Sequence, residues 1–300
     1  MADRRLQVFH AVAKYRSFTR AADALFMTQP AVTFQIRHLE EEVNTRLFER
    51  RHGGIDLTPA GELMFGYAEK ILGLADEMDK RLGEMTGEMR GELTVGAIAT
   101  VAEIDLPNIL SEFNALYPQV RVRLIVGNTE TLEQRVASHE LDVALVGSPP
   151  RLAGLTGVPA HTDPFLVVCA PDHPLASLDK VSAATLADYE FLSREPGSGT
   201  REVVRAYFQS QGIDPEQLKT QMELGSHHAL KGVVLTGLGY ALMPLRTVRR
   251  ETERGELVTI PLDPPLNGTI HFVYPEDRYQ TRLTATFIDF SRRKMKYPLS

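Results

Sequence analysis

The chain has 300 residues, a net charge of −6 and a single cysteine. Its length predicts two or more domains, and one cysteine excludes an intrachain disulfide framework. The charged N-terminus precedes no long apolar segment, so we expect neither a signal peptide nor a membrane span, and a cytoplasmic protein. Cys169 lies in an apolar run, which favours a buried structural thiol over a redox switch.

The first sixty residues predict three short helices followed by a basic strand. Apolar residues recur at helical spacing from residue 6 onward. Ser17 or Thr19 can cap a second helix through its hydroxyl, and Thr28 can cap a third. Pro30 suits the first turn of that third helix, because a missing N–H costs little there.

The third helix has the side chains of a DNA reader. Its apolar face should pack on the first two helices, and the candidate DNA-binding residues on and before it are Thr28, Gln29, Pro30, Thr33, Phe34 and Arg37. Gln and Arg can bond to base edges, whereas Phe or a Thr methyl can contact a thymine methyl. An ordinary amphipathic helix with a solvated polar face is the alternative. The tight turn, the proline and the downstream Arg50 and Arg51 favour a winged helix-turn-helix, whose second helix enters the major groove.

Bulk charge alone does not identify a DNA-binding domain here. Residues 1–65 contain 9 Lys and Arg against 8 Asp and Glu, a net charge of +1. A nearly neutral domain must therefore cluster its cations locally. We expect that cluster at Arg37, Arg46, Arg50 and Arg51, with residues 40–42, three glutamates, facing away.

Residues 59–89 predict one long helix with an apolar seam. Its apolar side chains recur at steps of three and four, at Tyr67, Ile71, Leu74, Met78 and Leu82. Such a seam favours pairing with a partner helix. The alternative is a helix that packs only on its own domain.

From residue 90 onward, strands and helices alternate, which predicts an α/β domain. Pro- and Gly-rich breaks at residues 147–159 and 262–268 could be two crossings between subdomains. One lobe would then hold about residues 90–161 and 268–300, and the other about 162–267. A hinge that is crossed twice places a cleft between the lobes.

Small hydroxyl residues at predicted helix starts could line that cleft. The candidate effector-binding residues are Thr100, Thr129, Ser198, Thr200 and Ser226. Helix N-termini present free N–H groups and a positive dipole end, which suit a carboxylate, phosphate or sulfate. Plain helix capping by the same hydroxyls is the alternative interpretation, so both remain open at this point.

The motifs expected of an enzyme or a metal site are missing from the sequence. Residues 197–199 do not form a G-x-S-x-G elbow, and residues 237–239 lack the third glycine of a dinucleotide fingerprint. His227 and His228 are adjacent, so on a helix they diverge by about 100° and cannot readily share a metal. We expect both to be solvated or capping histidines. The sequence predicts no catalytic residues, no metal and no cofactor other than a small-molecule effector.

Four N-terminal motifs resemble the LysR-type transcriptional regulators, in order and at matching spacing. They are SFTRAA at residues 17–22, QPAV at 29–32, LFER at 47–50 and LTPAG at 57–61. LDVA at 141–144 and GLGYALMP at 237–244 fit the effector domain of the same family. Two departures are Phe34, where many members carry a polar or basic residue, and Ile98 with Ala99, where hydroxyl residues are frequent.

The resemblance implies a winged helix-turn-helix DNA-binding domain (1–58), a linker helix that pairs two subunits (59–89) and an α/β effector domain (90–300). That last domain would be two-lobed, like periplasmic solute-binding proteins. The implied partners are double-stranded DNA, a small metabolite that we expect to be anionic, further copies of the chain as dimers that pair into tetramers, and RNA polymerase. A constitutive architectural DNA binder, or an enzyme with a DNA-binding appendage, is the alternative.

Overall fold

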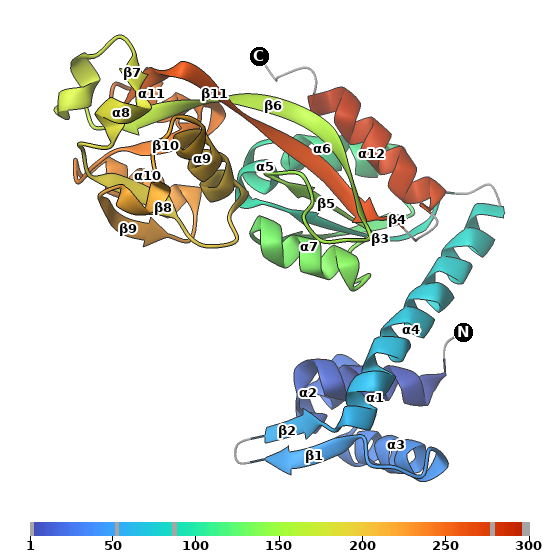
Figure 1. Ribbon diagram of the computed structural model, residues 1–300. Coiled ribbons are helices and arrows are strands. Elements are labelled where there is room, and N and C mark those ends of the chain that lie inside the picture. The colour runs from blue at the N-terminus through green and yellow to red at the C-terminus, as the bar shows by residue number, and fades with distance from the viewer. Residues whose placement is uncertain (1–2, 52–53, 86–88, 277–279, 296–300) are drawn as a thin grey trace. The chain divides into compact units, whose positions relative to one another are not determined.

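The structure, a computed structural model, describes residues 3–51, 54–85, 89–276 and 280–295. Contacts within the chain divide it into two units, Met1–Glu88 and Met89–Ser300, and we describe each by itself. Figure 1 labels the helices and strands of both.

The N-terminal unit is a three-helix bundle with a wing and a long helix. Its elements are α1 (Arg4–Tyr15), α2 (Phe18–Ala24), α3 (Gln29–Glu42), β1 (Phe48–Arg51), β2 (Gly54–Leu57) and α4 (Pro59–Met85). Val8, Phe9 and Val12 of α1 pack with Val32 and Ile36 of α3 in the core. The strands β1 and β2 pair antiparallel. This arrangement is the winged helix-turn-helix that the sequence predicts.

Side-chain caps begin the helices where the sequence places them. The Ser17 hydroxyl accepts a hydrogen bond from the N–H of Arg20 at 3.3 Å, so Ser17 rather than Thr19 caps α2. The Thr28 hydroxyl accepts one from the N–H of Ala31 at the start of α3. Each cap satisfies an N–H group that a helix leaves without an internal partner.

Lobe 1 of the C-terminal unit is a sheet covered on both faces. Its strands are β3 (Gly91–Ala97), β4 (Val120–Val126) and β5 (Val143–Val146), and its helices are α5 (Ala99–Ile104), α6 (Leu106–Leu116), α7 (Thr129–Ala137) and α12 (Arg282–Met295). Val143 and Leu145 pack against α6 and α12, whereas Ala144 and Val146 pack against α7. Alternate side chains of one strand thus enter two cores, and Figure 1 shows α7 and α12 on opposite sides of the strands.

Lobe 2 surrounds a second core that contains Cys169 and Tyr240. Its strands are β7 (Val181–Ser182), β8 (Phe191–Arg194), β9 (Thr220–Leu224) and β10 (Ala241–Pro244). Its helices are α8 (Ala183–Leu186), α9 (Gly199–Ser210), α10 (His227–Val234) and α11 (Arg249–Glu253), with short 3₁₀ turns η1 (Pro174–Ser177), η2 (Pro215–Gln217) and η3 (Leu245–Thr247). The Cys169 thiol is fully buried and free, as expected of a structural cysteine.

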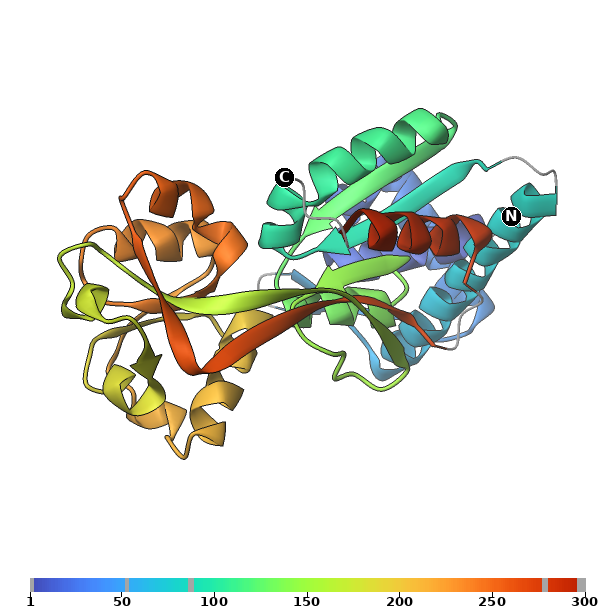
Figure 2. The same cartoon turned by 90° about the horizontal axis from the view of Figure 1, so that it is seen from above.

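Two long antiparallel strands connect the lobes, β6 (Leu155–Cys169) and β11 (Val258–Pro275). Figure 2 shows both as ribbons running from one lobe into the other. The crossings therefore run through paired strands, and the prediction that Pro- and Gly-rich breaks form them is wrong for residues 147–159. Gly268 faces Asp163 in this ladder, and a Cβ there would lie 2.3 Å from the Phe165 ring.

Candidate DNA-reading face and interlobe cleft

Helix α3 turns its predicted DNA-binding side chains away from the core. Gln29, Thr33, Phe34 and Arg37 are all exposed, and Phe34 keeps 64% of its surface accessible. The Gln29 amide donates to the Thr33 hydroxyl at 3.2 Å, so these two side chains support one another. An aromatic ring so exposed gains nothing from burial in the unit itself, which leaves it available to another surface.

Sequence reasoning missed Phe26. It lies in the turn between α2 and α3, with φ of 53° and 99% of its surface exposed. A left-handed backbone is normally marked by Gly, Asn or Asp, so a phenylalanine gives no warning of it. The turn directly precedes the N-terminus of α3, which makes Phe26 a second aromatic candidate for DNA contact.

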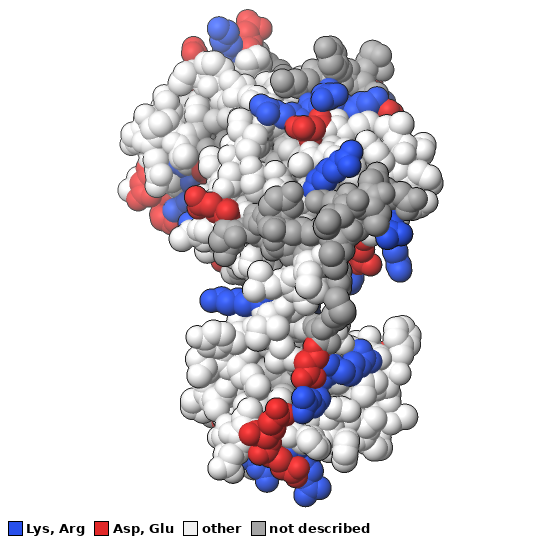
Figure 3. Space-filling view, turned by 90° about the vertical axis from the view of Figure 1, so that its right-hand side faces the viewer, with Lys and Arg blue, Asp and Glu red and all other residues white. Residues whose placement is uncertain are grey.

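The cations of this unit are interleaved with acids. Arg46 lies 3.6 Å from Glu40, and Arg37 lies 4.0 Å from Glu41. Glu40 also accepts hydrogen bonds from the backbone N–H groups of Leu47 and Phe48, which fixes the start of the wing. The expectation that these glutamates face away is therefore wrong for two of them. In the lower half of Figure 3, the charged side chains lie mainly in one band in which red and blue alternate, so this face shows no patch of one sign.

The wing and the seam are described only in part. Arg50 and Arg51 belong to β1, but their side chains, like that of Leu82 in α4, lie outside the described residues. The other seam residues Tyr67, Ile71, Leu74 and Met78 are exposed, as is Leu63, which the sequence interpretation omitted. The seam is thus an apolar stripe without a partner inside the described part of this unit.

The C-terminal unit brings Thr100 and Thr200 to the cavities between its lobes and Thr129 against Gly199 of the other lobe, whereas Ser226 lines neither of these cavities. Thr100 and Thr129 come from lobe 1, and Ser198, Thr200 and Ser226 from lobe 2. Ser198 and Ser226 are helix caps, since their hydroxyls accept from the N–H groups of Arg201 and Ala229. Thr100 and Thr200 cap no helix, because Ile98 and Ser198 occupy the cap positions of α5 and α9.

The lobes touch closely beside these residues. Between the lobes, the N–H of Glu130 donates to the carbonyl of Gly197 in lobe 2 at 3.1 Å. Within lobe 1, the neighbouring Thr129 accepts a hydrogen bond from the N–H of Gly147 at 3.3 Å. A Cβ at Gly199 would lie 2.8 Å from the Thr129 hydroxyl and 2.9 Å from the Gly147 carbonyl carbon. Only glycine at position 199 lets α9 approach lobe 1 so closely.

Two neighbouring cavities occupy the cleft. An inner chamber of about 20 Å³ is lined by Thr100 and Ile98 from lobe 1 and by Thr200 and Arg246 from lobe 2. An outer cavity of about 990 Å³ opens beside it, between α5 and α6 of lobe 1 and α10 and α11 of lobe 2. Thr100, Asp163 and Arg246 line both cavities, so these three side chains separate the chamber from the outer cavity.

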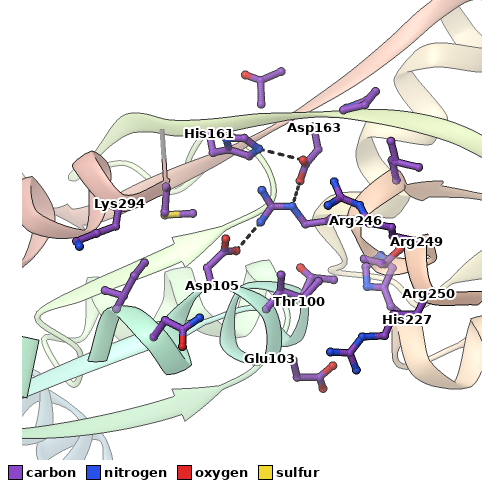
Figure 4. Close-up of a pocket in the computed structure, with 18 of the residues that line it drawn as sticks. Thr100, Glu103, Asp105, His161, Asp163, His227, Arg246, Arg249, Arg250 and Lys294 are labelled. Atoms are coloured by element: carbon purple, nitrogen blue, oxygen red, sulfur yellow. Dashed lines mark hydrogen bonds and ion pairs between the residues drawn. The ribbon is translucent and has the colours of Figure 1, made fainter. Parts of the chain in front are cut away.

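Arg246 forms an ion-pair cluster across the cleft, drawn in Figure 4. Its Nη1 lies 2.5 Å from Asp105 of lobe 1, and its Nε lies 2.6 Å from Asp163 on β6. His161 contacts Asp163 at 3.0 Å. Burial raises the pKa of Asp105 above its usual value, although the attraction of Arg246 lowers it in part. No sequence pattern indicates this cluster, since Asp105 and Arg246 lie 141 residues apart.

Arg246 keeps donors for a ligand despite its two partners. A guanidinium has five N–H donors, and the two ion pairs use Nη1 and Nε. Among the described residues, Nη2 has no partner. Arg249 and Arg250 are further cations at the rim of the outer cavity. The cluster therefore joins the two lobes by ion pairs and leaves the Nη2 group of Arg246, its free edge, able to bind an anion.

His227 contradicts the expectation of a solvated or capping histidine. It is buried, and it contacts Arg194 and the Thr200 hydroxyl, whereas His228 is exposed. Burial and, after it, the charge of Arg194 lower the pKa of His227 to about 3. Among the described residues, no group of three His, Cys, Asp or Glu could hold a metal ion. No helix in the described ranges is long and apolar enough to cross a membrane.

Comparison with known proteins gives the family. Residues 4–62 match the model of the bacterial regulatory helix-turn-helix protein, lysR family, and residues 86–296 match that of the LysR substrate binding domain. The chain is 36% identical over 260 residues to a RuBisCO operon transcriptional regulator of Allochromatium vinosum, covering 87% of this chain and 85% of that one. It is 37% identical over 254 residues to the HTH-type transcriptional regulator CfxR of Cupriavidus necator, covering 85% and 79%.

Solved structures agree with this assignment. The regulatory domain of Synechocystis CcmR, solved in complex with 2-PG, is 30% identical and has a TM-score of 0.63; the match covers 69% of this chain and 98% of that one. A full-length OxyR variant from Pseudomonas aeruginosa has a TM-score of 0.73 at 22% identity, covering 99% and 95%, which shows a shared fold. Both domain models, the curated relatives and the fold place this chain in the LysR family of transcriptional regulators.

Proposed function

We propose that this regulator controls carbon-fixation genes, RuBisCO genes among them, in response to a small phosphorylated carboxylate that binds between its lobes. Relatives named as RuBisCO operon regulators support the gene class, and the 2-PG bound to the CcmR regulatory domain supports the effector class. The observation that carries the effector site is the shared chamber of Thr100 and Thr200, two hydroxyls from opposite lobes beside Arg246.

The chemistry of that chamber suits an oxyanion. Thr100, Thr200 and the Nη2 group of Arg246 can all donate hydrogen bonds, and hydrogen bonds to a charged acceptor are the stronger kind. The Asp163 carboxylate also lines the chamber, where it is paired with Arg246. Helix α9 also begins here, at Gly199, and its first N–H groups have no partners inside the helix. Arg249 and Arg250 at the outer rim can receive the second charged group of a two-ended anion.

The chamber must expand to admit this ligand. A cavity of about 20 Å³ has room for about one water molecule, and a phosphate group is larger. We therefore regard the structure as a closed arrangement of the lobes, and the effector as favouring a more open one. The effector then alters DNA binding only as far as it binds the open arrangement more tightly than the closed one.

Assembly and location follow the same proposal. The exposed seam of Tyr67, Ile71, Leu74 and Met78 pairs α4 with its copy in a second subunit, which gives a dimer with two DNA-reading faces, and dimers pair further into tetramers. A protein that reads DNA to control transcription acts in the cytoplasm and meets RNA polymerase there.

Two measurements on the full-length protein test the proposal. Calorimetry should show that 2-phosphoglycolate or 2-phosphoglycerate binds. Glycolate and inorganic phosphate should each bind about tenfold more weakly or worse, a loss of about 1.4 kcal/mol in binding free energy. Selection from random DNA should yield an operator that occurs upstream of RuBisCO genes. A protein that binds none of these anions, or whose operator lies only elsewhere, would contradict the corresponding half of the proposal.

The variant Thr100→Val separates the effector site from simple structural roles. It keeps the side-chain volume and removes a hydroxyl that caps no helix. Effector affinity should fall while effector-free DNA binding persists. Equal effector affinity in both proteins would remove Thr100 from the site. DNA binding that no ligand changes would instead favour a constitutive architectural protein.

A further inference from the structure

A buried polar row lies behind the Thr200 hydroxyl in lobe 2. Arg194 donates to both carboxylate oxygens of Glu195, at 2.8 and 3.0 Å, and to the carbonyl of Leu224. Its Nη1 lies 2.6 Å from Nδ1 of His227, and Nε2 of His227 lies 3.1 Å from the Thr200 hydroxyl. Arg194, His227 and Thr200 are each at least nine-tenths buried.

The shortest contacts of the row favour one arrangement of protons. A guanidinium can only donate, and Nη1 of Arg194 lies 2.6 Å from Nδ1 of His227 but 3.4 Å from Nε2, so we take the nearer nitrogen, Nδ1, as the unprotonated acceptor. A neutral imidazole then carries its proton on Nε2 and donates it to Thr200. The depressed pKa of His227, which burial causes first and Arg194 second, agrees with a neutral ring.

This arrangement determines what the Thr200 hydroxyl offers to the cleft. Its oxygen already accepts from His227, and no described residue accepts its own hydrogen. We propose that Arg194 and His227 are positioning residues that hold Thr200 as a hydrogen-bond donor to an oxyanion in the inner chamber. The inference rests on the proposed effector site and deepens it, because it explains why that site selects a hydrogen-bond acceptor.

The charge balance of the row supports a role in selectivity. Glu195 neutralises Arg194 from the side opposite His227, and a neutral imidazole adds no charge. The row therefore gives direction to the hydroxyl without placing a full positive charge in the chamber. A ligand oxygen that carries no hydrogen can accept the hydrogen bond that the Thr200 hydroxyl donates. An ammonium group can only donate, and so would face the hydrogen of that hydroxyl.

Nitrogen-15 NMR of the histidine-labelled full chain tests the proton arrangement without any ligand. The His227 signals, assigned by their loss in His227→Gln, should show an unprotonated Nδ1 and a protonated Nε2. The opposite tautomer or a charged ring would overturn the inference whatever the effector proves to be.

Calorimetry with 2-phosphoglycolate tests the consequence for binding. Thr200→Val should lower affinity by about tenfold or more, the size expected for a hydrogen bond to a charged group, whereas Thr200→Ser should bind like wild type. His227→Leu should show a similar loss. His227→Gln offers an acceptor to Arg194 and a donor to Thr200, so it should restore most of the affinity. His38→Leu, at an exposed histidine of α3 in the N-terminal unit, is the matched control.

Non-additivity identifies the row as one unit. The double variant Thr200→Val with His227→Leu should bind no more weakly than Thr200→Val alone, because His227 acts only through the hydroxyl. Losses that add, or a folded His227→Leu protein with wild-type affinity, would overturn the inference and leave the effector site standing. Wild-type protein that binds none of the phosphorylated carboxylates would refute the proposed effector class, and the role of Thr200 as their donor with it.

Discussion

Replacing Arg246 with methionine should destabilise the C-terminal unit by about 3–5 kcal/mol, the cost of removing one partner from a buried ion pair. Arg246 lies between two carboxylates, Asp105 of lobe 1 and Asp163 of β6, at 2.5 and 2.6 Å. The three side chains keep only 14%, 14% and 12% of their surfaces exposed. An exposed ion pair would contribute about 0–1 kcal/mol. We expect the larger loss here because these ion pairs are buried.

The loss should depend on pH. Burial already raises the folded-state pKa of Asp105, and Arg246 is the main group that lowers it. Without Arg246 that pKa rises further. A carboxyl with a raised folded pKa binds its proton more tightly when folded, so its stabilising contribution is present below the unfolded value and is lost as pH rises through the folded pKa. The difference between wild type and Arg246→Met should therefore narrow as pH falls from 7 toward the reference value of 3.8.

Urea unfolding followed by tyrosine fluorescence measures this loss in the full-length protein. There is no tryptophan, and of the nine tyrosines only Tyr15 and Tyr67 precede residue 89, so the signal reports mainly on the C-terminal unit. Arg249→Met is the control: Arg249 is exposed and forms no ion pair with a described residue, so its loss should cost less than about 0.5 kcal/mol. Equal losses in the two variants, or a loss that does not change with pH, would refute the reasoning.

Three further outcomes test other parts of the molecule. Aspartate at both Ile71 and Leu74 places charge in the apolar seam, so sedimentation should show smaller species and gel shifts weaker binding to paired half-sites. Phe34→Ala should weaken operator binding, and replacing thymine by uracil at the contacted position should weaken wild type but not the variant. Burial raises the pKa of Cys169 to about 11, so a thiol reagent at pH 7 should modify it only after urea unfolding.

The N-terminal unit was predictable because its determinants are local. Ser17 and Thr28 cap helices within three residues of the N–H groups they accept from, and the apolar spacing of α3 lies within one helix. The wing is local too, because its two short strands, β1 and β2, are neighbours in the sequence. What could not be predicted is Phe26, since nothing about a phenylalanine indicates a left-handed turn.

The cleft was predictable in its position but not in its chemistry. Thr100 follows β3, and parallel α/β sheets place ligands at the carboxyl ends of their strands, so a strand–helix junction marks the edge of the site. The links of Arg246 to Asp105 and of Arg194 to His227 join residues 141 and 33 positions apart. No periodicity or spacing encodes such pairs. The first link exists only after β6 and β11 have brought the lobes together, and the second only after lobe 2 has folded with α10 beside β8.

The same two networks determine how an effector can act. Separation of the lobes stretches the link between Arg246 and Asp105, and exposes a carboxylate whose burial had raised its pKa. The solvation that Asp105 regains offsets part of the lost attraction. An anion that binds Thr200 and the Nη2 group of Arg246 supplies the remaining free energy that separation of the lobes requires. Tenfold tighter binding to the open arrangement contributes about 1.4 kcal/mol, which biases a balanced equilibrium but does not lock it. A link of several kcal/mol would resist such a ligand, so the partial compensation at Asp105 is what brings the opening within its reach.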